Sequence, residues 1–317
     1  RPPQPGAFPR PAHPLAPFVF GVPMPLHAIP PHRSAAAVAA ATALILALSA
    51  CAPGTSSGAA GTGPSTASAD VPSSHVHGLS VDRGTGRVLL ATHEGLFDVS
   101  KSPATKIGGT NDLMGFTATA DQGVFYASGH PGPGSDLPNP LGLIKSVDGG
   151  KTWEQLSRQG ESDFHALTTA RSGIVAYDGK LRISPDGQTW TDIAAGFVPA
   201  VLAGTPETDT VLATTREGLQ RSTDGGKTWQ QVTTAPIIQF AAFASGTEVL
   251  GVEPNGTVHH SDDAGNTWTR AGRINGQVQA ITAVKGAEGK PWIWAATTDG
   301  LITSTDGGAT FRRADAA

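Results

Sequence analysis

The chain has little cysteine, little charge of either sign and no long apolar run. Its single cysteine, Cys51, excludes any Cys-x-x-Cys metal signature. Lysine and arginine together number 22 against 26 acidic residues, and no basic stripe is present, which argues against a nucleic-acid partner. The apolar run from Ala35 to Leu48 is about 14 residues long, too short for an ordinary membrane-spanning helix. That run therefore needs another explanation.

The N-terminal segment has the order of a secretory signal. Arg33 precedes the apolar run, and Leu-Ser-Ala-Cys at residues 48–51 follows it. A basic residue, an apolar core and small residues before a cleavage site are typical of an export signal. Leu-Ser-Ala-Cys resembles the bacterial lipobox, which implies that Cys51 is lipidated and becomes the mature N-terminus. The alternative is a buried free thiol, which fits poorly with the Ser/Gly/Thr/Ala-rich tract that follows.

These features divide the first 74 residues into three parts. Residues 1–23 are rich in proline and precede Met24, so we expect an over-extended N-terminus, with translation starting at Met24 or nearby. Residues 24–50 are the expected signal peptide, and residues 51–74 hold the lipidated cysteine and a flexible linker. The protein would then be extracytoplasmic, anchored to the bacterial cell membrane as a lipoprotein. Cleavage would also make the net charge of −4 more negative, because residues 1–50 carry arginine and no acidic residue.

One phrase recurs in the rest of the chain. Its copies read SVDGGKTW, SPDGQTW, STDGGKTW, SDDAGNTW and STDGGATF, and they begin at Ser146, Ser184, Ser222, Ser261 and Ser304. Their starts lie about 40 residues apart, a period that indicates repeated supersecondary units. Each copy places Asp-Gly or a related pair between two short β-rich runs, so each predicts a hairpin turn.

The phrase resembles the Asp-box, or BNR, repeat of bacterial sialidases and many non-enzymatic propellers. In that family the Asp-box is a structural turn on the periphery of a blade, away from the active site. The resemblance implies a role in the fold for Asp148, Asp186, Asp224, Asp263 and Asp306. The aromatic residue that closes each copy can pack between neighbouring sheets. Two copies depart from the pattern, because the second is one residue short and the last ends in Phe311 instead of tryptophan.

The apolar alternation between the copies predicts four strands in each unit. Residues 197–236 show it most clearly, as PAVLAGT, DTVLATT, GLQRS and TWQQVT. We therefore expect residues 75–317 to form an all-β, six-bladed propeller of four-stranded antiparallel blades. The chain ends on an outer strand, Phe311–Arg313, so no strand exchange that would close the ring is evident, and how the ring closes stays open. The first blade has SKSPATKIG in place of the Asp-box. The expected blades are about 75–112, 113–159, 160–196, 197–236, 237–275 and 276–317.

Strand order predicts which face of the propeller each loop occupies. In an antiparallel meander, the turns between strands one and two and between strands three and four share one face. The Asp-boxes are turns between strands three and four, so they mark the face that we name the bottom face. The turns between strands two and three, and the connections into each blade, are expected at the top face and at the mouth of the central channel.

Histidines gather at the predicted top of the first three blades: His75, His77, His93, His130 and His165. His259 and His260 fall instead on the third strand of the fifth blade. Imidazoles converging from several loops could bind copper or zinc, with Asp163 and Glu94 as ligands or as partners that orient the rings. The alternative is a set of scattered polar loop residues, with His75 and His77 facing the same way only because a strand has a period of two.

The second blade carries a long top-face connection, Pro131–Pro140, rich in proline and glycine. Long loops in a compact repeat are often functional. A solvated insertion with no role is the alternative.

Sialidase-like catalysis is a competing hypothesis. That family uses an arginine triad, a Tyr/Glu nucleophile pair and an acidic proton donor, and its Phe/Tyr-Arg-Ile-Pro motif does not occur here. The candidates that remain in top-face turns are Tyr177, Asp178, Arg216 and Glu217, with Arg158 and Arg273 in connections between blades. Glycoside hydrolysis also needs two carboxyl groups at a defined separation, which a sequence does not provide.

The mature domain resembles bacterial lipoproteins described as glycosylhydrolase-like because of their BNR repeats. It also resembles Asp-box propellers that act as assembly factors on membrane complexes. A shared fold is weak evidence for a shared activity. We therefore expect first a lipid-anchored propeller whose top face binds a small ligand, glycan, protein or metal ion. A glycosyl hydrolase comes second, and a membrane-associated assembly scaffold comes third.

Overall fold

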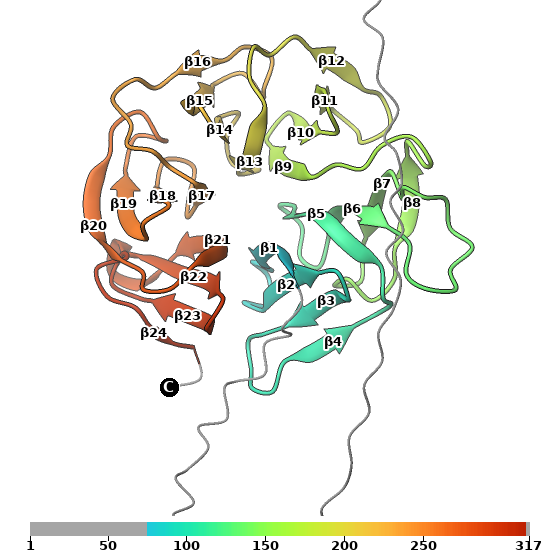
Figure 1. The fold of residues 1–317 in the computed structure, drawn as a ribbon, viewed down its shortest axis with the longest axis horizontal. Coiled ribbons are helices and arrows are strands. Elements are labelled where there is room, and N and C mark those ends of the chain that lie inside the picture. The colour runs from blue at the N-terminus through green and yellow to red at the C-terminus, as the bar shows by residue number, and fades with distance from the viewer. Residues whose placement is uncertain (1–74, 315–317) are drawn as a thin grey trace, which may run out of the picture. The chain divides into compact units, whose positions relative to one another are not determined.

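The computed structural model describes residues 75–314, and the expectations for residues 1–74, Cys51 among them, lie outside the described residues. Within 75–314, 24 strands form six four-stranded antiparallel sheets, which surround a central channel as the blades of a propeller (Figure 1). The fold class predicted from the sequence is confirmed. In this part of the chain no helix has the length and apolar character needed to cross a membrane.

The strands of each blade follow chain order from the channel to the rim (Figure 1). Blades 1 and 2 contain β1 (Val76–Val81), β2 (Val88–Thr92), β3 (Gly95–Asp98), β4 (Thr105–Ile107), β5 (Asp112–Ala118), β6 (Phe125–His130), β7 (Leu143–Ser146) and β8 (Glu154–Ser157). Blades 3 and 4 contain β9 (Ala166–Ala170), β10 (Gly173–Tyr177), β11 (Leu181–Ser184), β12 (Thr191–Ile193), β13 (Pro199–Gly204), β14 (Val211–Thr215), β15 (Gly218–Ser222) and β16 (Gln230–Gln231). Blades 5 and 6 contain β17 (Phe240–Phe243), β18 (Val249–Val252), β19 (Thr257–Ser261), β20 (Thr269–Arg273), β21 (Val278–Lys285), β22 (Pro291–Thr297), β23 (Gly300–Ser304) and β24 (Arg312–Arg313), with a short 3-10 turn at Ala287–Gly289.

The second strand of each blade forms the core between neighbouring blades. β2 and β14 read VLLAT and VLATT, and every one of their residues is buried. A continuous apolar run of this length is typical of a strand that is covered on both faces. The outermost strands are short and largely exposed, as in β16 and β24. The core therefore lies between blades rather than within any one of them.

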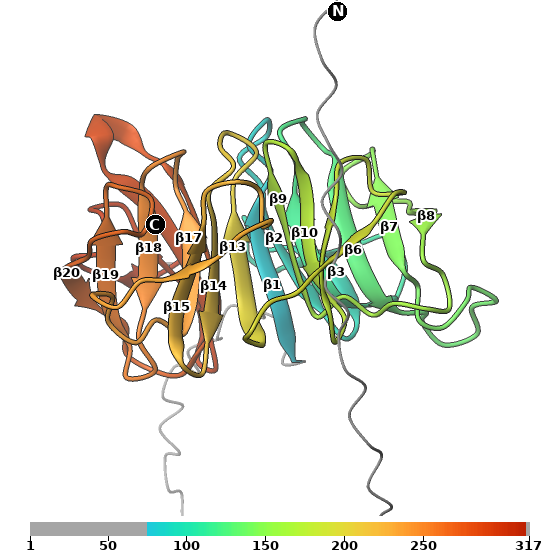
Figure 2. The same ribbon diagram turned by 90° about the horizontal axis from the view of Figure 1, so that it is seen from above.

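Hydrogen bonds between turns confirm the predicted division into two faces. At the bottom, the N–H of Gly149 in an Asp-box donates to the carbonyl of Gly123, which lies between β5 and β6. At the top, the N–H of Gly142, between β6 and β7, donates to the carbonyl of Ser162, on the way into blade 3. Seen from the side, the strands run between these two sets of loops (Figure 2).

Each Asp-box aspartate is occupied by its own turn. In the third copy, Asp224 Oδ1 accepts the backbone N–H groups of Lys227 and Thr228, at 3.0 and 2.9 Å, and Oδ2 accepts the Thr228 hydroxyl at 2.6 Å. Gly226 has a φ of 87°, a left-handed conformation that favours glycine. The carboxylate stabilises the turn and has no free oxygen to offer a ligand.

The fourth Asp-box predicts a pH-dependent stability. Burial alone would raise the pKa of Asp263, but hydrogen bonds from the N–H and hydroxyl of Thr267 outweigh it and lower the pKa to about 2. A carboxyl group whose pKa is lowered in the folded protein stabilises it above the ordinary value of 3.8, and this contribution is lost as the pH falls through about 2. We expect Asp263→Asn to lower the free energy of unfolding by about 1 kcal/mol at pH 7, with the difference from wild type shrinking toward pH 2.

The neighbouring Asp262 is a matched control, because it is exposed and lies outside the hydrogen bonds of the turn. Urea unfolding of Asp263→Asn, Asp262→Asn and wild type at pH 7, 5 and 3 measures the effect. Equal destabilisation by the two substitutions would contradict the role of the turn.

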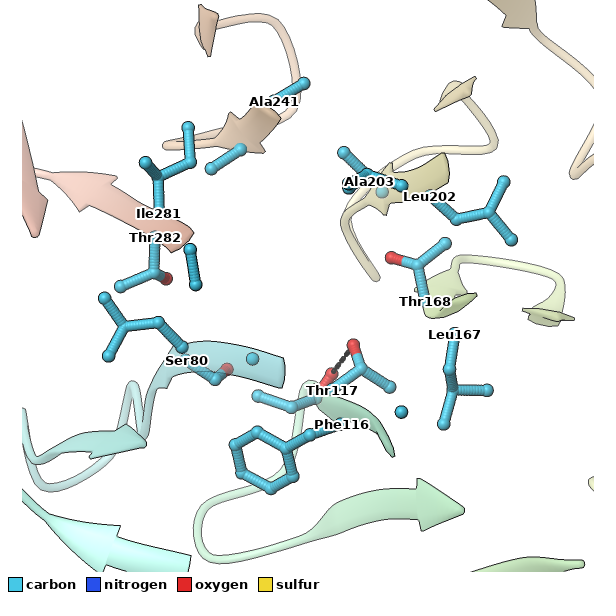
Figure 3. A pocket seen from close by; sticks show the side chains of 18 of the residues that line it. Ser80, Phe116, Thr117, Leu167, Thr168, Leu202, Ala203, Ala241, Ile281 and Thr282 are labelled. Atoms are coloured by element: carbon cyan, nitrogen blue, oxygen red, sulfur yellow. Dashed lines mark hydrogen bonds between the residues drawn. The ribbon is translucent and has the colours of Figure 1, made fainter. Parts of the chain in front are cut away.

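The channel is lined by the innermost strand of every blade and holds about 180 Å³ of space that water-sized molecules can occupy. Figure 3 shows that its wall is made of small, apolar and hydroxyl side chains, including Ser80, Thr117, Thr168 and Thr282. At the bottom, Arg83 of blade 1 forms an ion pair with Glu207 of blade 4. Because those two blades face each other across the ring, this ion pair spans the lower mouth of the channel.

In the described residues, blades 1 and 6 close the ring without exchanging a strand, a point that the sequence left open. Within residues 75–314, β1 pairs only with β2, and β24 pairs only with β23. Their contact is apolar: Val76, Leu79, Val81, Val88, Leu90 and Val99 of blade 1 pack with Ala280, Ala296 and Leu301 of blade 6. Within the part of the chain that the structure describes, no backbone hydrogen bond joins these two blades, and side chains make the contact.

Candidate metal centre

The structure brings the five predicted histidines to the top of blades 1 to 3, in two neighbouring groups. The first histidine group consists of His75, His77, His93 and Asp112, and the second of His130, Asp163 and His165. His77 and His165 also line the channel, so the two groups meet at its upper mouth.

Three side chains of the first group point their polar atoms at a common space. His93 Nδ1 lies 2.7 Å from Asp112 Oδ2 and 3.3 Å from His77 Nε2, and His77 Nε2 lies 3.5 Å from Asp112 Oδ1. One ligand atom from each of the three residues can be chosen so that all lie within 4.8 Å of one another. The His75 ring stacks on that of His77 at 5.9 Å between centroids, so it borders this space.

Local backbone features place these side chains. The pairing of β1 with β2 is irregular between Val76 and Gly78, so His77 lies at a β-bulge, a feature that redirects a side chain. His93 lies in the short turn between β2 and β3, which is held by a 3.0 Å hydrogen bond from the Thr92 hydroxyl to the carbonyl of Gly95. Asp112 is the first residue of β5. Three segments that are separate in the sequence thus converge.

The electrostatics of the first group favour a neutral imidazole at its centre. Burial, together with the neighbouring His93, lowers the pKa of His77 to about 4, although the Asp112 carboxylate opposes this shift. His77 is therefore uncharged near neutral pH and has a lone pair to donate to a cation. Asp112 Oδ1 is buried and accepts no hydrogen bond.

Asp112 was missed in the sequence analysis, although it completes the first group. A signal existed in its position. Asp112 begins the first strand of blade 2, and the corresponding segment of blade 1 carries His75 and His77. Aligning the first strands of all six blades would have placed the carboxylate beside the imidazoles.

The second group is also built around one carboxylate. Asp163 Oδ2 lies 2.7 Å from His165 Nε2 and 3.1 Å from His130 Nε2. Asp163 Oδ1 is buried and accepts no hydrogen bond. Phe164 lies between Asp163 and His165 in the sequence. Its side chain is fully buried and stacks on Trp190, with ring centroids 4.8 Å apart, and this packing anchors residues 163–165.

The two groups are joined through blade 2. Asp112 of the first group and His130 of the second are direct partners in the pairing of β5 with β6. The close approach requires glycine at residue 129, because a Cβ there would lie 2.0 Å from the carbonyl oxygen of Asp112. The charge of His165 also contributes to the lowered pKa of His77, so the groups lie within electrostatic reach of one another.

The remaining candidates lie apart from these groups. The backbone N–H of Glu94 donates to Thr92 Oγ1, and within residues 75–314 its side chain has no hydrogen bond or ion pair. Tyr177 packs against the apolar core between blades 3 and 4. His259 and His260 pair instead with Glu253 and Glu248 in blade 5.

Asp178, a candidate catalytic acid, belongs to an ion-pair network. Ser162 donates a hydrogen bond to its Oδ2, Arg182 bonds to both oxygens, and Arg158 lies 3.9 Å away. Burial alone would raise the pKa of Asp178, but the bonds from Ser162 and Arg182 lower it. A carboxylate held in this way stays ionised near neutral pH and is a poor proton donor. Within the described residues, Arg216 and the Glu217 carboxylate have no ion pair or hydrogen bond of this kind. Glu217 forms hydrogen bonds there only through its backbone: its N–H donates to Thr215 Oγ1, and its carbonyl accepts from Gln231 Nε2.

The arrangement suits a borderline transition metal. Two imidazole nitrogens and a carboxylate oxygen are ligands of zinc and copper, and three protein ligands leave a coordination position for water or an external group. The lone pair of His77 and the unpartnered oxygen of Asp112 are the features that a bound cation would satisfy. The residues present therefore fit such an ion.

Comparisons with known proteins agree with the repeat and the fold. The BNR/Asp-box repeat family matches residues 220–231, which run from the end of β15 through the Asp-box turn to β16. No curated protein sequence matches the chain. Among solved structures, the GH74 enzyme of Niastella koreensis is similar at 19% identity and a TM-score of 0.53, covering 76% of this chain and 37% of that one. The GH74 xyloglucanase from Xanthomonas campestris is similar at 17% identity and a TM-score of 0.55, covering 76% and 39%.

YCF48 from Cyanidioschyzon merolae is less similar, at 12% identity and a TM-score of 0.44, covering 75% of this chain and 97% of that one. The chain spans well under half the length of the two GH74 proteins. At such identities the likeness shows the propeller fold, and the function has to be argued from the site.

Proposed function

We propose that this six-bladed Asp-box propeller binds a copper or zinc ion at the top of its channel, through His77, His93 and Asp112. The observation that carries the proposal is the convergence of three ligand atoms within 4.8 Å of one another. Anchored to the membrane through a lipid on Cys51, the protein would present the ion outside the cytoplasm. Such a protein captures or hands over a metal ion, and the open position can accept a ligand from a partner.

The protonation states of the first group support this proposal. A single proton on His93 Nδ1 can serve either Asp112 or His77, but not both, since one N–H donates in one direction. A cation placed among the three side chains would interact with every one of them at once. Imidazole ligands must be deprotonated to bind a metal, and a His77 with a pKa of about 4 meets this condition near neutral pH.

Glycoside hydrolysis and protein assembly remain alternatives that rest on the fold. The network around Asp178 leaves that residue without the raised pKa that a catalytic acid needs. A glycan or a protein could still occupy the top face as the external partner of the ion. Turnover of aryl glycosides that is lost in Glu217→Gln would favour the hydrolase.

Metal uptake by the full chain, purified without a histidine tag, tests the proposal. After dialysis against Zn(II) or Cu(II) and removal of free metal, we expect wild type to retain the ion and His93→Gln to retain one equivalent less. The control is His260→Gln, since His260 lies on β19 in blade 5, away from the site. Wild type that retains no metal would overturn the proposal, and so would His93→Gln with unchanged uptake.

A further inference from the structure

We infer that the channel below the proposed ion holds a short-chain carboxylate, whose carboxyl group binds the ion and whose far end carries an uncharged oxygen. This inference rests on the proposed metal-binding function and names the class of ligand that the same site takes. The observation that carries it is a ring of side chains at one depth of the channel wall, which bears hydroxyl groups on one side and methyl groups on the other (Figure 3).

The ring occupies one equivalent position in the innermost strand of every blade. In blades 1, 2, 4 and 6 this position lies four residues after the residue at which the pairing with the second strand becomes irregular. In blades 3 and 5 it is identified by its pairing with Val175 and Leu250 of the second strands. The members of this channel ring, in the order of the blades, are Ser80, Thr117, Thr168, Ala203, Ala242 and Thr282. The hydroxyl groups thus come from the consecutive blades 6, 1, 2 and 3.

The hydroxyl groups of the channel ring are available to a ligand. Within residues 75–314, those of Ser80, Thr168 and Thr282 form no hydrogen bond, and that of Thr117 reaches only the Ala118 carbonyl, at 3.4 Å. Each hydroxyl group can donate one hydrogen bond, and a keto or hydroxyl oxygen accepts two. The alanines of blades 4 and 5 offer only methyl groups. A ligand that matches the ring therefore has an oxygen on one side and carbon on the other.

Charge decides which end of the ligand carries the carboxyl group. At the floor of the channel, Arg83 forms an ion pair with Glu207 Oε1, and Oε2 accepts the N–H of Gly246 at 2.7 Å. The guanidinium is thus already paired, and the channel ring itself carries no charge. A carboxylate at the depth of the ring would be buried without a cation, which is costly. At the mouth, an ion bound by His77 would supply the positive charge and an open coordination position.

The distance from the mouth to the ring fits a short ligand. Ser80 follows His77 by three residues on β1, which corresponds to roughly 10 Å along a strand. A metal–oxygen bond of about 2 Å and a hydrogen bond of about 2.8 Å leave roughly 5 Å for the ligand, the length of a chain of about four or five carbons. The channel volume of about 180 Å³ agrees with a molecule of about eight non-hydrogen atoms, since a cavity of roughly 150 Å³ encloses benzene.

Levulinate is the probe that tests the inference, because it has a carboxylate at one end and a keto oxygen beside a methyl group near the other. Isocaproate is the matched probe, in which a methyl group replaces the keto oxygen. In calorimetric titrations of the Zn(II)-loaded, full-length protein, we expect levulinate to bind at least about 5-fold more tightly than isocaproate, the effect of one hydrogen bond. Removal of the zinc is expected to weaken levulinate binding at least about 10-fold, because the buried carboxylate then lacks its cation.

The wild-type comparison distinguishes this inference from the proposed function without any substitution. Zinc uptake with no binding of levulinate, or with equal binding of levulinate and isocaproate, would overturn the inference and leave the metal site intact. A protein that takes up no zinc would overturn both.

Valine substitutions in the channel ring give the second measurement. Thr168→Val and Thr282→Val each remove one hydroxyl group and nearly keep the shape of the side chain. Each is expected to weaken levulinate binding about 5-fold, with zinc uptake and isocaproate binding unchanged. Thr257→Val is the control, since Thr257 is a buried threonine on β19 that does not line the channel. An equal loss in Thr257→Val, or no loss in either ring variant, would contradict the role of the channel ring.

Discussion

The Asp112→Asn variant is expected to bind Zn(II) or Cu(II) at the first histidine group at least about 100-fold more weakly than wild type. Asparagine keeps the shape of the side chain but removes its negative charge and one of its oxygen ligands. Asp112 lies within ligand distance of both His77 and His93, so its loss also removes the only acidic partner that these two rings have within residues 75–314. Isothermal titration calorimetry at constant pH, with competing chelator where binding is tight, measures the change.

Glu94→Gln is the matched control for this experiment. Glu94 follows His93 directly and carries the same charge as Asp112, but it contributes only its backbone N–H to the local hydrogen bonds. Its substitution is expected to leave the affinity within about twofold of wild type, in the range of a solvent-screened charge. If Glu94→Gln lost as much affinity as Asp112→Asn, general electrostatic attraction at the top face would explain the binding, and a specific ligand set would not.

The Phe164→Ala variant is expected to lower the free energy of unfolding by roughly 3–5 kcal/mol. Phe164 is 0% exposed, and its ring packs on Trp190. Its backbone N–H donates to the hydroxyl of Ser128 in blade 2, at 2.9 Å. Truncation leaves a cavity directly between Asp163 and His165, so both side chains lose the anchor that holds them. Urea unfolding measures the change in stability.

Phe243 and a conservative substitution are the comparisons for this result. Phe243 is 5% exposed on β17 in blade 5, so Phe243→Ala should also cost about 3 kcal/mol. Phe164→Leu, which leaves a smaller cavity, is expected to cost less than about 1.5 kcal/mol. If Phe164→Ala cost no more than Phe164→Leu, the packing of the Phe164 ring on Trp190 would not anchor residues 163–165.

The repeat explains why so much of the architecture could be predicted. An Asp-box in five of the six blades sets the strand order, and strand order alone assigns His93 and His130 to the same face as His77 and His165. That argument needs no knowledge of side-chain contacts. It follows from the antiparallel connection of the strands, and the hydrogen bonds between the turns agree with it.

Contacts within the site could not be predicted in the same way. Asp112 is one of 26 acidic residues, and only the convergence of β1 and β5 distinguishes it from the others. Glu94 is closer to His93 in the sequence, yet its side chain takes no part in the group. The division of the histidines into two groups depends on the pairing of β5 with β6, and the ion pair of Arg83 with Glu207 joins residues far apart in the chain. Such contacts depend on three-dimensional distances that a period of about 40 residues does not contain.

The seam between blades 6 and 1 would give an ion bound at the first histidine group a mechanical role. Among residues 75–314, no backbone hydrogen bond crosses the seam, so within them the resistance to opening there comes from apolar packing. Blade 1 forms one side of the seam, and its innermost strand, β1, carries His77, while Asp112 belongs to blade 2. An ion bound to both would fasten the terminal blade to the rest of the ring at its top. Release of the ion would then loosen the blade at which the ring can open, coupling metal occupancy to the rigidity of the whole propeller.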